Sequence, residues 1–450
     1  MSNNKQINTS FLQEISKLIS NKDNEEIIGK IKNLHVADIA EILKKLSSEQ
    51  SSFLFQLINE EKSALVLIEV EDELREHLLS NLSSKEIANH IIENLESDDA
   101  TDVISELPKK QKDEVLSLIE DNNHASDITD LLNYPEDTAG GLMAKELIKV
   151  NENWNSLQCL KEMRKQAPEV KEVHTIYVID DNQKLIGTLS LKRLLITKSK
   201  IAIKDITNTE IISVTVAEDD ENVANIMNKY NLVVIPVVNE DNVLVGRITI
   251  DDVMDVVKEE AEKDYQMASG ITEDVESSDS VWQLTRARLP WLIIGLIGGV
   301  LGAKIIGLFD IEENIQLAFF IPLIAAMGGN AGVQSAAIVV QGLANDSIKL
   351  NKMFKKLIKE LGVALLNGLI CSLIILGTTI MIGYSIELSL TVSISLLSVI
   401  VFAALFGTFV PLTLERYKID PALATGPFIT TINDILGLYI YFLIGQAILS

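Results

Sequence analysis

Asp434 is the one acidic residue that interrupts a long apolar stretch near the C-terminus of this 450-residue chain. An ionised carboxylate at such depth in a membrane costs several kcal/mol and usually marks an ion path. The alternative is a protonated aspartic acid that is hydrogen-bonded to a neighbouring helix. Gly437 follows one turn later, and glycine loosens a membrane helix so that backbone carbonyls can face a cavity. This arrangement favours cation chemistry.

A second stretch of breaker residues lies in another apolar run. Residues 327–335 read Met-Gly-Gly-Asn-Ala-Gly-Val-Gln-Ser and follow Pro322. Irregular backbone inside a membrane is tolerated only where protein or water satisfies it, so the glycines around Asn330 favour a cavity-lining segment. Close helix packing is the alternative. Packing better explains four glycines of an earlier run, Gly295, Gly298, Gly299 and Gly302.

Five charge-poor runs could hold these residues in a bilayer. Each is long enough for the roughly 20 residues that a membrane helix needs. They are Leu289–Ala303 with Ile305–Phe309, then Asn314–Asn345, Leu361–Ile386, Leu388–Leu414 and Pro421–Ser450. Lys and Arg flank the first run and fill the loops between runs two and three and between runs four and five. The positive-inside rule therefore predicts a cytoplasmic N-terminus and an outside C-terminus.

Charge divides the chain into two parts. The whole chain has 39 Lys and Arg against 64 Asp and Glu, a net charge of −25, yet its mean hydropathy is +0.22. Residues 1–280 are acidic, whereas residues 281–450 are nearly neutral. This excludes a general nucleic-acid binder and a purely soluble enzyme. Cys159 and Cys371 offer neither a disulfide framework nor a metal pair. Residues 1–28 lack the apolar segment of a cleavable signal peptide.

The acidic part contains two kinds of repeat. Residues 34–120 show short amphipathic helices with predicted caps at Ser47, Ser83 and Ser97, which indicates a stacked, superhelical domain. Residues 177–190 match residues 236–249 at an offset of 59, and each copy reads as strand, turn, strand and helix.

The second repeat resembles a tandem pair of CBS domains, modules that often sense small ligands. Such modules commonly hold an adenosine ribose with an Asp at the start of the last helix. The second copy has Asp252 there and the first has Arg193. The resemblance therefore implies ATP only as an optional ligand.

The order of the helical domain, the CBS pair, the connecting helix and the apolar runs, together with three motifs, resembles that of the MgtE family of magnesium channels. The resemblance extends from about residue 30 onward. The motifs are Gly329-Asn330-Ala331-Gly332, the run from Pro421 through Asn433-Asp434 to Leu438, and Pro135–Met143. The resemblance implies a homodimer in a lipid bilayer, with a pore along its two-fold axis. It implies Asp434 as the central ion site, with Gly329, Asn330, Thr430 and Gly437 nearby.

The resemblance also implies cytosolic Mg²⁺ sites that regulate the pore. The matching positions are Asp98, Asp102, Asp219, Glu221, Asp252, Asp255, Glu260 and Asp264. Two positions depart from the family pattern, because Asn231 and Lys263 stand where acidic residues can occur. The chemistry agrees independently, since Mg²⁺ keeps several waters and uses one or two carboxylates. No phosphate-binding loop is present, which argues against ATP-driven pumping.

We therefore expect a multidomain fold with an α-helical superhelical N-terminal domain, α+β tandem CBS domains and a five-helix all-α transmembrane domain. The expected boundaries are a tail at 1–30, the N domain at 31–133, CBS domains at 134–204 and 205–262, a connecting helix at 263–285 and the membrane domain at 286–450.

The expected function is import of Mg²⁺ through the cytoplasmic membrane by a non-enzymatic channel that cytosolic Mg²⁺ closes. The alternatives are a broader transporter for Mn²⁺ and Co²⁺ and a membrane-anchored ligand sensor. An intramembrane aspartyl protease would need two aspartates where only Asp434 is available. A chloride channel would have its CBS pair after a larger membrane domain.

Overall fold

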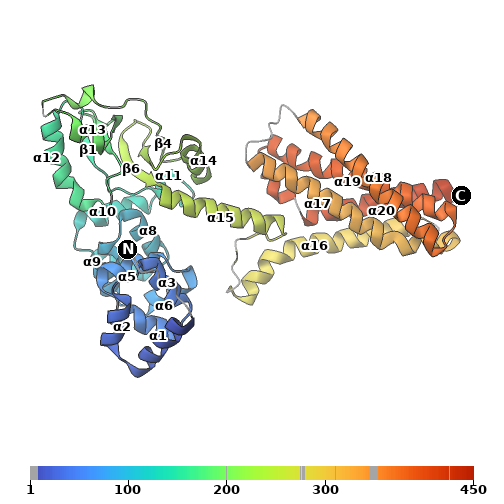
Figure 1. Ribbon diagram of the computed structural model, residues 1–450, viewed down its shortest axis with the longest axis horizontal. Helices are drawn as coiled ribbons and strands as arrows, with labels where there is room; N and C mark the ends of the chain where they lie inside the picture. Colours follow the sequence, from blue (N-terminus) through green and yellow to red (C-terminus); the bar gives the residue numbers. More distant parts are fainter. Residues whose placement is uncertain are drawn as a thin grey trace. The chain divides into compact units, whose positions relative to one another are not determined.

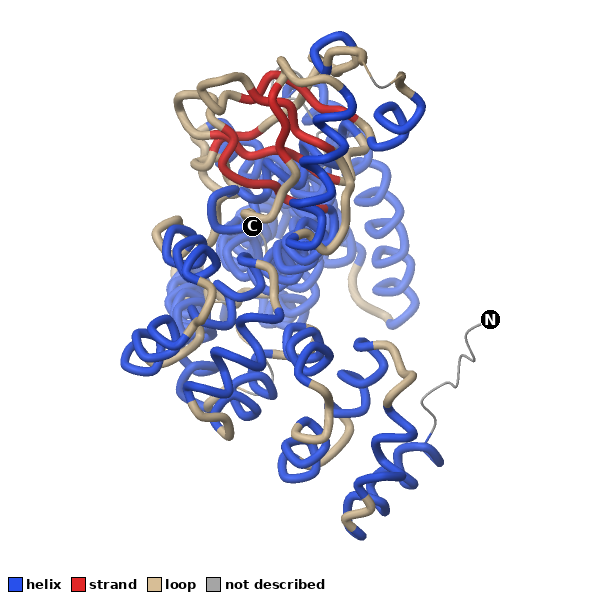
Figure 2. Tube along the Cα trace, turned by 90° about the vertical axis from the view of Figure 1, so that its left-hand side faces the viewer, coloured by secondary structure: helices blue, strands red, loops and turns tan. Residues whose placement is uncertain are grey.

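The computed structural model describes residues 9–198, 200–273, 275, 279–309, 311–344, 353–424 and 426–449. The chain divides into two compact units, Met1–Lys258 and Glu259–Ser450. Figure 1 follows the described elements along the chain, and Figure 2 shows the strands, in red, gathered in one region.

Short helices build the N-terminal domain of the first unit around one apolar core (Figure 1). Their amphipathic faces supply that core, since each helix alone is too short to be stable in water. The helices are α1 (Thr9–Asn21), α2 (Asn24–Ile31), α3 (Val36–Lys44), α4 (Ser48–Phe55), α5 (Glu60–Ile68), α6 (Asp72–Ser80), α7 (Ser84–Glu86), α8 (Ser97–Ser105), α9 (Lys109–Leu118) and α10 (Asn122–Leu131). A π-helical turn (Ile87–Ile91) and a 3₁₀ turn (Ile92–Asn94) continue α7.

Two sequence expectations about this domain need correction. Residues 9–30 are not a tail, because α1 and α2 bury Ile15, Ile19 and Ile27 in the common core. Ser47 and Ser83 cap their helices as predicted. The third cap is Glu96 rather than Ser97, whose hydroxyl instead donates to the Glu146 carboxylate at 2.8 Å.

The two CBS copies each form a three-stranded sheet. The first has the order β1 (Lys149–Asn151), β2 (Ile176–Ile179), β3 (Leu185–Leu189), and the second β4 (Val214–Thr215), β5 (Val234–Val238), β6 (Leu244–Thr249). In each, the first pair of strands is parallel and the second is antiparallel. The register shifts at Val178/Ile179 and at Val237/Val238, which are equivalent positions of the predicted repeat.

Helices cover these sheets and complete two separate apolar cores. They are α11 (Ala139–Leu142), α12 (Ser156–Gln166), α13 (Leu191–Ile196), α14 (Asp220–Tyr230) and α15 (Ile250–Ala268), with 3₁₀ turns at Ala167–Glu169 and Ile203–Asp205. The predicted connecting helix at 263–285 is not continuous: α15 ends at Ala268, and the next helix begins at Val281. Gly270 adopts φ +82° in between, a backbone conformation that ends a helix readily.

The second unit contains five helices long and apolar enough to cross a membrane among its described residues. They are α16 (Val281–Ile306), α17 (Ile321–Ala344), α18 (Met353–Ile382), α19 (Ile386–Arg416) and α20 (Pro427–Leu449), with 3₁₀ segments at Ile311–Phe320 and Pro421–Ala424. The central helix is α19, because α17, α18 and α20 all pack along it.

Two of these helices begin eight residues earlier than the charge-free runs suggested. The first, α16, starts at Val281 with a capping box between Ser280 and Gln283. The third, α18, starts at Met353 rather than Leu361, and so contains Glu360. Charged residues therefore extend the membrane helices at their ends, which a search for uncharged runs misses.

Candidate functional site

Three of the predicted ion-path residues meet on one face of the second unit. A Cβ atom placed on Gly329 of α17 would lie 3.5 Å from Thr430 Cγ2 and 3.7 Å from Asp434 Oδ1, both on α20. The glycine therefore brings the backbone of α17 against the aspartate. Asp434 is half-buried and lines a cavity of about 870 Å³ together with Thr430 and residues of α16.

The remaining two predicted residues lie beside this face in different settings. Asn330 is exposed at the next position of α17. Gly437 is buried against α19, where an added Cβ would lie 3.1 Å from Val399 Cγ1. The structure thus brings Gly329, Thr430 and Asp434 together, whereas Gly437 serves helix packing.

The glycines of α16 have two roles rather than one. Gly298 and Gly302 face Thr431 and Leu438 of α20, as expected for packing. Gly295 and Gly299 have no atom within 4 Å of an added Cβ, and both line the cavity that contains Asp434. Half of this glycine stripe therefore provides open space instead of close contact.

Asn433 is a buried polar residue, and its role was not predicted from the sequence. Its side chain is fully buried, and neither amide atom has a hydrogen-bond partner among the described residues. It fills the space over Gly332 of α17, where a Cβ atom would collide with the amide nitrogen Nδ2. An asparagine next to the only aspartate of an apolar run was the available signal.

Glu360 corrects the expectation that Asp434 is the only acidic residue inside a membrane helix. It lies in α18 with 7% of its surface exposed. Its carboxylate accepts a hydrogen bond from the hydroxyl of Ser335 on α17 at 2.7 Å. The neighbouring Lys355, Lys356 and Lys359 make the sequence around Glu360 resemble a charged loop, which is why its place in a helix is not predicted.

A separate acidic cluster lies in the first unit, where the start of α8 meets the start of α15. Burial, followed by the charges of Asp99 and Asp252, raises the pKa of Asp98 well above its usual range. Burial and the Asp252 charge raise the pKa of Asp99 to about 6. Asp98 and Asp252 were predicted for this role, and Asp99 was missed. A divalent cation is suited to such mutually repelling carboxylates.

Asp102 and Asp252 belong to the same acidic region. Burial, with Asp99 next, raises the pKa of Asp102 to about 7, although Arg75 opposes the shift. Burial also raises the pKa of Asp252, whose carboxylate accepts hydrogen bonds from the Thr249 amide at 2.9 Å and hydroxyl at 2.7 Å. Within the described ranges, no three His, Cys, Asp or Glu side chains are grouped to hold one metal ion. A cation here would keep part of its water shell, as Mg²⁺ does.

A cationic residue is built into the edge of this cluster. Arg247 of β6 is 5% exposed, and its guanidinium donates to Glu96 Oε1 at 2.9 Å and to the Glu146 carbonyl at 2.6 Å. Ser97 donates its amide and hydroxyl to the Glu146 carboxylate at 3.1 and 2.8 Å. These bonds join the N-terminal domain to both CBS copies.

The other predicted regulatory residues are not in this cluster. Asp219 caps α14, and Glu221 and Asp255 are exposed on their helices. Glu260 and Asp264 belong to the second unit, where burial and then the Asp420 and Glu260 charges raise the pKa of Asp264. The structure therefore divides the predicted set among at least three places.

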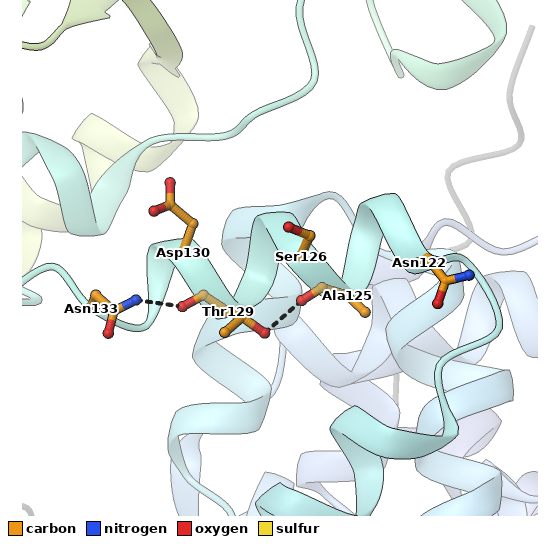
Figure 3. A pocket seen from close by; sticks show the side chains of 6 residues that line it. All are labelled: Asn122, Ala125, Ser126, Thr129, Asp130 and Asn133. Atoms are coloured by element: carbon orange, nitrogen blue, oxygen red, sulfur yellow. Dashed lines mark hydrogen bonds between the residues drawn. The ribbon is translucent and has the colours of Figure 1, made fainter.

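A shallow pocket of about 510 Å³ on α10 is polar but offers no comparable site. Figure 3 shows that its polar groups bond within their own helix: Thr129 Oγ1 donates to the Ala125 carbonyl at 2.7 Å and Asn133 Nδ2 to the Thr129 carbonyl at 2.8 Å. Asp130 is paired with Lys145 at 2.6 Å.

An acidic helical domain, two repeated α+β modules and five apolar helices, one of which carries a half-buried aspartate, form the architecture of a multi-pass membrane transporter of cations. Comparison with known families agrees along the chain. The MgtE intracellular N domain matches residues 34–137, the CBS domain matches residues 139–198 and 203–259, and the MgtE divalent cation transporter domain matches residues 321–444.

Relatives that match 70–72% of the chain identify the family. The magnesium transporter MgtE of Bacillus subtilis is 34% identical over 319 residues, 70% of this chain and 71% of that protein. The magnesium transporter MgtE of Thermus thermophilus is 34% identical over 329 residues, 72% of this chain and 73% of that protein. The chain belongs to the MgtE family of magnesium transporters, which are not enzymes.

Solved structures agree for the cytosolic part. The soluble part of a magnesium transporter has a TM-score of 0.50 at 26% identity, covering 56% of this chain and 98% of that one. The cytosolic domain of the Mg²⁺ channel MgtE in complex with ATP has a TM-score of 0.51 at 29% identity, covering 54% of this chain and 99% of that one. The expected fold class and family are thus confirmed.

Proposed function

We propose that two copies of this chain form a Mg²⁺ channel that imports the ion through the cytoplasmic membrane along Asp434. The observation that carries the proposal is the meeting of Gly329, Thr430 and Asp434 on one face. Since position 329 has no side chain, the Asp434 carboxylate stays accessible to a hydrated ion. One Asp434 from each copy would supply the one or two carboxylates that Mg²⁺ uses while keeping its waters. Asn330 orients those waters through its amide.

A homodimer is supported by an exposed apolar patch on the second CBS copy. Tyr230, Val233, Met254 and Val257 are 49%, 54%, 59% and 48% exposed. Val233 and the start of α15 are neighbours, because the Val233 carbonyl accepts from the Ile250 amide at 3.0 Å. Contiguous apolar surface of this kind marks an interaction site. A second copy would cover it.

Cytosolic Mg²⁺ closes this channel in our proposal. Burial, and after it the repulsion between neighbouring carboxylates, raises the pKa values of Asp98, Asp99 and Asp102, and a bound cation would relieve that repulsion. A ligand that binds one arrangement better shifts the population toward it. Mg²⁺ at this cluster, which includes Asp252, stabilises the compact, closed arrangement, together with further ions at Asp219, Glu221, Asp255, Glu260 and Asp264. The sensor is cytoplasmic and the C-terminus outside, as the basic residues flanking the helices indicate.

ATP is an optional ligand of the CBS pair in this proposal. One similar cytosolic domain was solved in complex with ATP. In this chain, Asp252 stands at the position that would bind the ribose, and it already accepts two hydrogen bonds from Thr249. ATP would therefore have to share Asp252 with Thr249, and conduction itself would need no nucleotide.

Flux measurements in liposomes test the proposal. Purified protein should conduct Mg²⁺, and its fluxes of Mn²⁺ and Co²⁺ should be smaller. Asp434→Ala should abolish the flux, whereas Glu387→Ala, which removes an acid at the first turn of α19, should not. Equal fluxes of all three ions would favour a broader divalent cation transporter, and an absence of any flux would favour a membrane-anchored sensor.

A further inference from the structure

Glu360 is a buried acidic side chain that the proposed path does not use. An acid inside an apolar helix bundle is expensive unless it is bound, and such residues face the bundle interior. The Ser335 hydroxyl lies 2.7 Å from one of its oxygens and 3.0 Å from the Ala331 carbonyl of its own helix, and the bond to Glu360 is the shorter of the two. The residue therefore has a defined partner on the helix that carries Gly329 and Asn330.

Elsewhere, the described contacts of α17 with α19 are made by glycines and apolar groups. A Cβ atom on Gly407 of α19 would collide with the carbonyl of Gly332, so the two helix backbones touch there without side chains. Gly328 likewise packs on Val399 of α19. Contacts between glycines and apolar groups are close but lack the directionality of a hydrogen bond.

The hydrogen bond between Ser335 and Glu360 is a directional contact that constrains the position of α17. The helices α17 and α18 each pack along α19, and this bond joins them directly. Ser335 lies on the same buried side of α17 as Gly328 and Gly332. A hydrogen bond to a carboxyl oxygen is directional, so it constrains both the height and the rotation of the helix.

We infer that Glu360 is a positioning residue for the ion path: by accepting the Ser335 hydroxyl, it holds Gly329 and Asn330 of α17 opposite Thr430 and Asp434 of α20. The inference rests on the proposed function only in that this face carries the ion. Glu360 itself does not contact the ion.

A cross-link tests the positioning without reference to transport. The added Cβ of Gly329 lies 3.9 Å from Thr430 Cβ, within the range of a disulfide. The pair Gly329→Cys and Thr430→Cys, in a chain with Cys159→Ala and Cys371→Ala, should oxidise readily. Adding Glu360→Ala should slow cross-linking by roughly fivefold, the effect of losing about one hydrogen bond. Glu360→Gln should not, because its amide oxygen accepts the same bond.

Flux measurements then separate positioning from ion binding. Glu360→Ala should raise the Mg²⁺ concentration for half-maximal flux and lower the preference for Mg²⁺ over Co²⁺, and Glu360→Gln should restore both. Ser335→Ala should resemble Glu360→Ala, and it serves as the gentler variant if the latter does not fold. Ser335→Thr keeps the hydroxyl and should behave as the parent.

Two results would overturn the inference. Loss of function in Glu360→Gln as large as in Glu360→Ala would make the charge itself essential, and Glu360 an ion ligand. Unchanged cross-linking in both Glu360→Ala and Ser335→Ala would show that the bond positions nothing. Failure of the pore assignment looks different, because Asp434→Ala would then conduct normally while cross-linking still depended on Glu360.

Discussion

The guanidinium of Arg247 lies 2.9 Å from the carboxylate of Glu96, the residue that caps α8. This ion pair joins the second CBS copy to the N-terminal domain, next to the carboxylates that we propose bind Mg²⁺. Arg247 is thus a permanent positive charge at the edge of the site where we propose that exchangeable Mg²⁺ binds.

Removing this cation should loosen the N-terminal domain. Breaking a buried ion pair from one side costs about 3–5 kcal/mol, and the partial exposure of Glu96 places Arg247→Met near the lower end. Hydrogen exchange of α8 amides in Mg²⁺-free buffer should therefore accelerate strongly. Lys165→Met, which removes an exposed pair with Glu162, is the control and should change little. Unchanged exchange in Arg247→Met would show that the pair is dispensable.

The stability of the first unit should depend on pH when Mg²⁺ is absent. Asp99 and Asp102 have pKa values of about 6 and 7, above the ordinary 3.8. The folded state therefore holds protons that the unfolded state releases, and stability falls as pH rises from about 4 to about 7. Thermal unfolding of the first unit should shift downward over this range, and Mg²⁺ should restore it at pH 7.5.

Asp102→Asn isolates one part of this effect. The variant should be more stable than the parent at pH 7.5 without Mg²⁺ and similar to it at pH 4. Asp113→Asn changes an exposed acid of α9 and is the matched control. A pH-independent unfolding temperature between pH 4 and 7.5 in the parent would contradict the buried cluster.

Gly332 should tolerate no side chain. A Cβ atom there collides with the Asn433 amide and lies 2.8 Å from Ile429 Cγ2. Gly332→Ala should destabilise the membrane unit by about 1–3 kcal/mol, the usual range for overpacking. Gly377→Ala on α18, where an added Cβ has no atom within 4 Å, should be neutral. Thermal inactivation in detergent measures both, and equal stability of the two variants would contradict the packing described.

Asn330 should matter less for flux than Asp434. An amide orients the waters of a hydrated ion but brings no net charge, so Asn330→Ala should reduce Mg²⁺ flux partially where Asp434→Ala abolishes it. Cysteine labelling supplies the structural check. A residue 330 that reacts only with lipid-soluble reagents, combined with unchanged flux, would remove Asn330 from the path.

Gating should respond to the acidic cluster. Neutralising Asp98, Asp102, Asp252 and Asp255 together should leave conduction intact and raise the Mg²⁺ concentration that closes the channel. Limited proteolysis provides the measurement: millimolar Mg²⁺ should protect residues 265–285 in the parent and less so in the variant. If protection from proteolysis does not depend on Mg²⁺ in either protein, this gating is contradicted, whereas the pore proposal is unaffected.

Much of the architecture could be predicted from the sequence because its signals are local or repeated. The offset of 59 between CBS copies reappears as matched register shifts at Val178/Ile179 and Val237/Val238. Long apolar runs also predict the five membrane helices. The ends of those helices were missed where charged residues continue them, as at Glu360 in α18.

The site residues show where sequence reasoning stops. Asp434 is conspicuous because a lone carboxylate in an apolar run needs a reason. Asp99 and Arg247 have no such signal, because their roles depend on which distant residue the fold brings to them. Arg247 meets Glu96 across 151 positions of sequence. Only tertiary structure supplies such pairings.

The backbone contact between Gly332 and Gly407 also excludes water. Two backbones in contact leave no room for a solvent molecule, so this side of α17 is dry. The cavity that Asp434 lines is bounded by residues of α16, α17 and α20 and lies away from this contact. In the proposed channel, an ion with two charges gains about 4.6 kcal/mol for each 100 mV that it crosses there. A glycine pair that permits close packing thus also seals one side of α17 against leakage.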